Sequence, residues 1–185
     1  MTELTEADKD LLATELTRQA PCTRQRDSAT VETHMKALTL TQPWATLVAI
    51  GAKRIETRSW ATQYRGPLAI HAAKTFPEYA RTACIGGAIQ RALDAAGFDE
   101  NNLPRGVIVA TARLLHVDFL VSSDFDTARR DCRQFLDFHV NSDEEQFGDF
   151  SRGRYAWLLK DVVRMEPPIP ARGSLGLWEW SKAGA

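Results

Sequence analysis

The stretch GAKRIETRSW, residues 51 to 60, decides how the rest of the sequence is interpreted, because it places four charges between two apolar runs. TLVAIG precedes it and GPLAIHAA follows it, and both runs are typical of a protein core. The alternation in KRIETR predicts a β-strand, in which Arg54, Glu56 and Arg58 share one face and Lys53 points to the other. Such a strand either carries a solvated salt-bridge ladder or forms the wall of a polar cleft.

Outward from this strand, the pattern predicts about six strands separated by short helices. Without a regular alternation of strand and helix, this favours an α+β fold built on a small mixed β-barrel. The expected strands span 36–41, 53–60, 66–73, 106–120, 155–165 and 175–180. The expected helices span 43–51, 77–97 and 122–138, and the proline-rich EPPIPARG should separate the last two strands.

The N-terminal part differs from the rest. Residues 5–19 show a short amphipathic helical pattern, and 20–34 are polar and aperiodic, as in a linker. We therefore expect residues 1–34 to be a helical appendage and residues 35–185 to form the domain.

Composition narrows the class of protein. The 185 residues have 44% hydrophobic and 25% charged side chains, as in ordinary globular proteins, and no apolar run is long enough to cross a bilayer. The three cysteines are widely spaced and the four histidines form no cluster, which predicts a reduced cytoplasmic protein without a metal site. We also expect no cofactor and no membrane partner.

The net charge of −1 conceals an uneven distribution. Residues 53–81 contain six Lys or Arg and two Glu, whereas residues 120–150 contain eight acidic residues and three Arg. A local basic patch is what phosphate contact requires. Alternatively, the two segments neutralise each other in the fold.

The charged strand also carries a family resemblance. The pattern G-x-K-x-x-E-x-R, from Gly51 to Arg58, resembles the signature of the ASCH domain, which is named for its homology to a transcription coactivator. The similarity extends over residues 38–74, with QPWA, RSW and RGPLAIHA, and GSLGLW at 173–178 resembles the closing strand of the family.

This resemblance implies a PUA-like β-barrel with a cleft floored by the motif strand. It also implies binding of RNA or another single-stranded nucleic acid. Some family members resemble metal-independent ribonucleases or hydrolases that act on a modified nucleoside, so these remain alternatives, together with binding of a nucleoside-sized ligand.

Several residues are candidates for the nucleic-acid contact. We expect Lys53, Arg58 and Lys74 to contact phosphate. Glu56 is expected to orient the arginines or to accept a hydrogen bond from a base, and the aromatic rings that stack on bases are expected to be Trp60 and Tyr64. Two further residues lie at the start of the expected helix: Trp44 is expected in the core, and Gln42 is expected to reach the cleft.

An enzymatic function would use some of the same residues that are candidates for the nucleic-acid contact. The hydrolase pattern resembles a Lys followed three positions later by Thr, but Glu56 occupies the threonine position here, and a carboxylate is a poor substitute for a nucleophilic hydroxyl. Ribonuclease chemistry needs a base, an acid and a phosphate-binding cation. The candidates for these roles are Lys53, Glu56, Tyr64 and His71, which ends an apolar strand and is expected near the cleft mouth.

Overall fold

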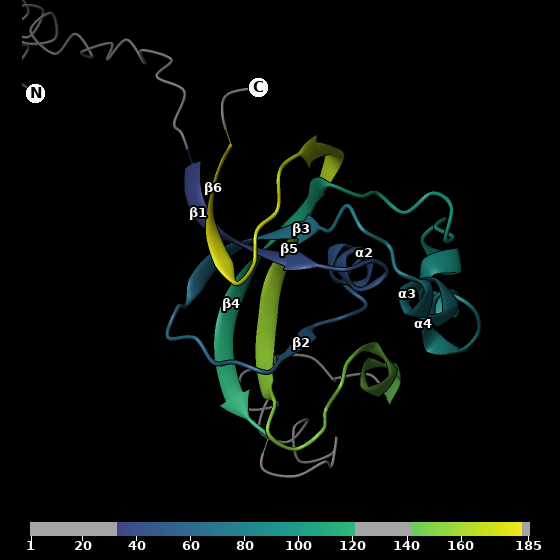
Figure 1. Cartoon of the computed structure of the whole chain (residues 1–185), viewed down its shortest axis with the longest axis horizontal. Coiled ribbons are helices and arrows are strands. Elements are labelled where there is room, and N and C mark those ends of the chain that lie inside the picture. The colour runs from purple at the N-terminus through teal and green to yellow at the C-terminus, as the bar shows by residue number, and fades with distance from the viewer. Residues whose placement is uncertain (1–32, 121–141, 183–185) are drawn as a thin grey trace, which may run out of the picture. The chain divides into compact units, whose positions relative to one another are not determined.

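The computed structural model describes residues 33–120 and 142–182. The expected helices at 5–19 and 122–138 lie outside these ranges, as do residues 20–32 of the expected linker, whereas its last two residues, Thr33 and His34, belong to the first strand. Ten elements follow in chain order (Figure 1): β1 (Thr33–Leu40), α2 (Trp44–Ala49), β2 (Ile55–Arg58), β3 (Gly66–Ala72), α3 (Glu78–Ala83), α4 (Gly87–Ala95), β4 (Val107–Phe119), the 3-10 helix η1 (Ser142–Phe147), β5 (Tyr155–Pro170) and β6 (Leu177–Lys182).

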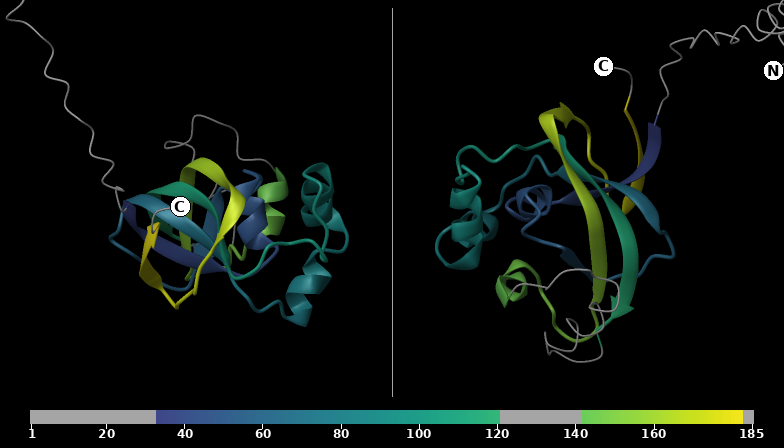
Figure 2. Two further views of the ribbon diagram at one scale, coloured as in Figure 1. Left: turned by 90° about the horizontal axis from the view of Figure 1, so that it is seen from above. Right: turned by 180° about the vertical axis from the view of Figure 1, so that it is seen from behind.

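The strands form one mixed sheet in the order β2-β5-β4-β3-β1-β6. The β1–β3 pair is parallel and the other neighbours are antiparallel. β4 and β5 are long and curved, and the helices lie on one side of the sheet (Figure 2). The expectation of about six strands in a mixed sheet with short helices is confirmed. The sheet does not close into a ring, because β2 and β6 are its two ends.

Two expectations about element boundaries were wrong. The single helix expected over 77–97 is two helices, because Gly86 and Gly87 both have positive φ, a backbone conformation that interrupts an α-helix. The prolines of EPPIP were expected outside any strand, yet β5 runs to Pro170. Pro167 and Pro168 are accommodated because the register with β4 shifts between Arg164 and Ile169, and β2 pairs only with the first part of β5.

The main core lies between the sheet and α2. It contains Leu38, Leu40, Val48, Leu68, Ile70, Leu114, Trp157 and Leu159, all buried. A second cluster joins α2 to α4 and η1 through Leu47, Leu93 and Phe147. Because α2 contributes to both clusters, the turn that leads from α2 into β2 is held on both sides.

Candidate functional site

The motif strand is positioned by the turn that ends α2. Gly51 has φ +76°, a conformation that favours glycine, and the Lys53 amide donates to the Leu47 carbonyl at 3.0 Å. β2 then pairs with the start of β5. The face expected to be polar carries Glu56, only 8% exposed, and Arg58, whose Nε lies 3.0 Å from Glu56 Oε1.

Lys53 is not where the sequence analysis expected it. Its side chain has no exposed surface, and its ammonium group donates to the carbonyls of Ile55 at 2.5 Å and Phe147 at 2.8 Å. The same Nζ lies 3.4 Å from Glu56 Oε2. Because these internal partners occupy the ammonium group, Lys53 does not offer a direct phosphate contact. Lys53 instead forms an ion pair with Glu56 and connects β2 to η1.

A second buried charge attaches η1 to the motif strand. The Glu144 carboxylate accepts hydrogen bonds from the amide of Arg54 at 2.8 Å and the amide of Ile55 at 2.9 Å. Burial raises the pKa of the Glu144 carboxyl, an effect opposed by Lys53 and by the two amides. Gly148 then passes close to the strand, since a Cβ there would lie 3.3 Å from Lys53 Nζ. The acidic segment thus docks, in part, on the basic one.

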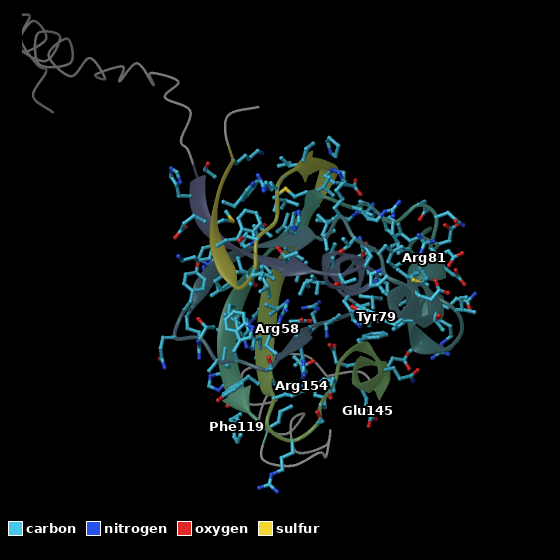
Figure 3. The ribbon with its side chains drawn as sticks, in the orientation of Figure 1. Arg58, Tyr79, Arg81, Phe119, Glu145 and Arg154 are labelled. Carbon is cyan, nitrogen blue, oxygen red and sulfur yellow. The ribbon has the colours of Figure 1, made fainter. Side chains whose placement is uncertain are left out.

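Docking of η1 against β2 leaves a cavity of about 490 Å³ between them. Its walls come from the end of β1, from β2, from α3 and from the segment around η1. In Figure 3, Arg58 and Arg154 come from the strand side of this space and Tyr79 comes from α3. We call it the motif cavity; it is lined by Thr39, Leu40, Thr41, Trp44, Glu56, Thr57, Arg58, Tyr79, Gln146, Phe147, Gly148, Asp149 and Arg154.

The charges of the motif cavity are paired. Besides its contact with Glu56, Arg58 donates through Nη2 to the Thr39 carbonyl at 2.9 Å. Arg154 Nη1 lies 3.2 Å from Asp149 Oδ2. Hydrogen bonds from Ser151, and the charge of Arg154, lower the pKa of Asp149. Two arginines and two carboxylates therefore balance, and the cavity at the motif is polar but not basic, in contrast to the expected basic cleft.

The aromatic side chains at the motif cavity are not the expected ones. Trp44 was expected in the core, and it does pack against the second cluster, but it is only partly buried and also lines the motif cavity. Its ring lies 6.2 Å from the Tyr79 ring, with 32° between the ring planes. Tyr79 is 63% exposed. Tyr79 lies in a polar helical stretch, so the sequence did not indicate that its ring would line the motif cavity.

Trp60 and Tyr64 are not among the residues that line the motif cavity. Trp60 packs edge-on against Trp157 at 4.6 Å, and the Tyr64 hydroxyl donates to the Pro67 carbonyl. Both rings cover the main core. Gln42 does not reach the cavity either, because it is buried and its amide bonds the Pro104 carbonyl and the Thr46 amide.

His71 and Lys74 lie at a second cavity of about 920 Å³. We call it the loop cavity, because the segments that follow β3, precede β4 and follow β5 form it. Its lining residues are Thr39, His71, Ala73, Lys74, Thr75, Arg105, Gly106, Pro170, Ala171, Arg172, Gly173, Ser174 and Leu175. His71 and Glu56 thus belong to different cavities, and the four acid–base candidates are not assembled around one site.

His71 is built into the wall of the loop cavity. It is 2% exposed, and Nε2 donates to the Ala171 carbonyl at 3.1 Å. Burial lowers its pKa, which favours the neutral ring. Gly173 covers the ring so closely that a Cβ there would lie 2.3 Å from His71 Cε1. Gly173, the first glycine of the GSLGLW segment, is therefore required by this close contact.

The ASCH domain family model matches residues 38–169 of this sequence, which include the motif strand and both walls of the motif cavity. The chain belongs to the ASCH domain family. The match ends before Gly173, so the GSLGLW segment lies beyond it.

Two curated relatives are similar to this chain at low sequence identity. Activating signal cointegrator 1 of Mus musculus and that of Homo sapiens are each 28% identical to this chain over 143 residues. These alignments cover 77% of this chain and 22% of the relative, so the chain spans about a fifth of the length of these curated relatives.

Two solved structures are also similar, the ASCH protein of Zymomonas mobilis and a mutant of it. Their sequence identities are 17% and 15% and their TM-scores 0.40 and 0.39, over 73% of this chain and 72% of theirs.

Between 33 and 120 and between 142 and 182, no three His, Cys, Asp or Glu side chains are grouped as metal ligands. None of the helices in these ranges combines the length and hydropathy that a bilayer crossing requires.

Proposed function

We propose that this ASCH domain binds single-stranded RNA and receives one of its nucleosides in the motif cavity. The observation that carries the proposal is a nucleoside-sized cavity whose walls combine two guanidinium–carboxylate pairs with two aromatic rings. Membership of the ASCH family supports it, because these domains are associated with RNA binding.

The paired charges favour a base over a phosphate in this cavity. Glu56 and Asp149 would repel a phosphate, whereas a base presents both donors and acceptors without net charge. Glu56 is held by Lys53 and Arg58 and accepts hydrogen bonds only, so it suits an amino group on the base edge. The aromatic rings of Trp44 and Tyr79 supply the apolar contact.

Tyr79 offers the cleanest test because it is exposed and its truncation should leave the fold intact. We expect Tyr79→Ala to weaken binding of a short fluorescent single-stranded RNA by about 1–3 kcal/mol, as measured by anisotropy. The matched control is Phe119→Ala, which truncates another exposed ring. Phe119 lies 5.1 Å from the Tyr155 ring and lines neither cavity.

The same samples are examined on a denaturing gel and with single-stranded DNA of matched sequence. Intact RNA together with an effect confined to Tyr79→Ala supports the proposal. Equal affinity of wild type and Tyr79→Ala contradicts it. Shortened strands would instead establish the ribonuclease alternative.

A further inference from the structure

The loop cavity differs from the motif cavity in charge. Three cations line it, Lys74, Arg105 and Arg172, and no acidic side chain is among its lining residues. All three are exposed, and within the described ranges none of them forms an ion pair with a carboxylate. Unlike the arginines of the motif cavity, these cations remain available to an anionic ligand.

The three cations come from segments that the fold brings together. The Gly106 amide donates to the Ala72 carbonyl at 2.8 Å, and the Ala171 amide donates to the Gly106 carbonyl at 3.1 Å. Gly106 and Ala171 are next to Arg105 and Arg172, and Ala72 lies two residues before Lys74. The Arg105 guanidinium also lies 5.9 Å from the Phe76 ring, which restricts its position. These backbone hydrogen bonds thus bring the three cations together at the loop cavity.

Thr39 connects the two cavities, because it lines both of them. On one side its carbonyl accepts the hydrogen bond from Arg58 at 2.9 Å. On the other side its hydroxyl donates to the Ser174 carbonyl at 2.9 Å and accepts from Trp178 Nε1 at 3.1 Å. Thr39 is therefore a wall residue that the two cavities share, and a strand that crosses it would contact both of them.

We propose that the loop cavity binds the phosphate backbone of the same RNA strand whose nucleoside enters the motif cavity. This inference rests on the proposed function and assigns a different part of the RNA to each cavity. The motif cavity holds an uncharged base, and the cations of the loop cavity, Lys74, Arg105 and Arg172, hold phosphodiesters. The natural ligand is then an oligonucleotide and not a free nucleoside, because a nucleoside without phosphate leaves three cations of the loop cavity unused.

The salt dependence of RNA binding tests this assignment. For single strands, log K falls as log salt rises, and this negative slope becomes shallower by about 0.7 for each phosphate contact that is lost. We expect Arg105→Gln and Arg172→Gln each to reduce the slope by about this amount, and Lys74→Gln to do the same. The control is Arg113→Gln, which removes the same charge from an exposed site on β4 outside both cavities.

The outcomes separate the two proposals. If Tyr79→Ala weakens RNA binding but the three loop-cavity variants keep the wild-type slope, the present inference fails and the proposed function stands. If the three variants change the slope while Tyr79→Ala has no effect, the assignment of a nucleoside to the motif cavity fails. The proposal that one RNA strand occupies both cavities then fails as well. Equal slope changes in Arg113→Gln and in the three variants would show a general charge effect and overturn the inference.

A competition experiment distinguishes binding of an RNA strand from binding of a free anion. We expect inorganic phosphate to compete with RNA only weakly, and a phosphate-free nucleoside to bind Arg105→Gln as it binds wild type. Strong competition by inorganic phosphate, with a loss of that competition in Arg172→Gln, would make the loop cavity a site for a free anion and contradict the inference.

Discussion

Replacing Lys53 with Met tests the central correction made by the structure, the burial of the motif lysine. The change removes the ammonium group from the Ile55 and Phe147 carbonyls and from Glu56. Removing one partner of a buried ion pair costs about 3–5 kcal/mol. Glu56 keeps Arg58 at 3.0 Å, which favours the lower part of this range, but each carbonyl left without a donor adds about 1 kcal/mol or more. We therefore expect a loss near 3–5 kcal/mol.

Urea unfolding monitored by tryptophan fluorescence measures this loss. With a slope of about 1–3 kcal/mol/M, the midpoint should fall by at least about 1 M. Lys74→Met is the matched control, since it removes an exposed lysine of the loop cavity and should change stability by less than about 0.5 kcal/mol. A Lys53→Met protein that unfolds within about 1 kcal/mol of wild type but no longer binds RNA would refute the structural role and make Lys53 a direct ligand contact.

Two further predictions concern the wall of the loop cavity. Gly173→Ala should destabilise the fold by about 1–3 kcal/mol, measured as a lower urea midpoint, because its Cβ would overlap the buried His71 ring; an unchanged midpoint would show that the ring moves aside freely. His71 has a folded-state pKa below its unfolded value of about 6.5, so the stability that it contributes is present above that pH and is lost as the pH falls through the folded-state pKa. Wild type should therefore lose more stability than His71→Gln between neutral pH and mildly acidic pH, and equal losses would contradict the neutral assignment.

Much of the fold could be predicted from periodicity and turn residues. The alternation in KALTLT, KRIETR and GPLAIHAA indicated strands, and Gly51 marked the end of the helix before the motif. The double glycine at 86 and 87 lies in a window rich in helix-forming residues, so composition predicted one helix where the backbone of the two glycines separates two.

The site was harder to predict because its geometry depends on distant parts of the chain. A lysine is rarely fully buried, and the partners that bury Lys53 include a carbonyl 94 residues further on. Likewise, Glu144 is one of many acidic residues in its segment, and its sequence neighbourhood does not distinguish it from Asp143 or Glu145. Of the two alternatives for the uneven charge, the structure shows partial neutralisation within the fold, because Glu144 of the acidic segment is buried beside the motif strand and interacts with the charge of Lys53.

The way in which η1 is attached to β2 has a consequence for ligand choice across related domains. Lys53 and Glu144 hold the two walls of the motif cavity together through backbone atoms, and neither of them lines the cavity. Substitutions at Gln146 and Asp149 therefore alter the inner surface without disturbing the attachment. On the proposal that the motif cavity receives the ligand, two domains with the same signature strand would be able to accept different ligands in the same place, and exchanging these two residues would be a direct route to redesigning what the cavity accepts.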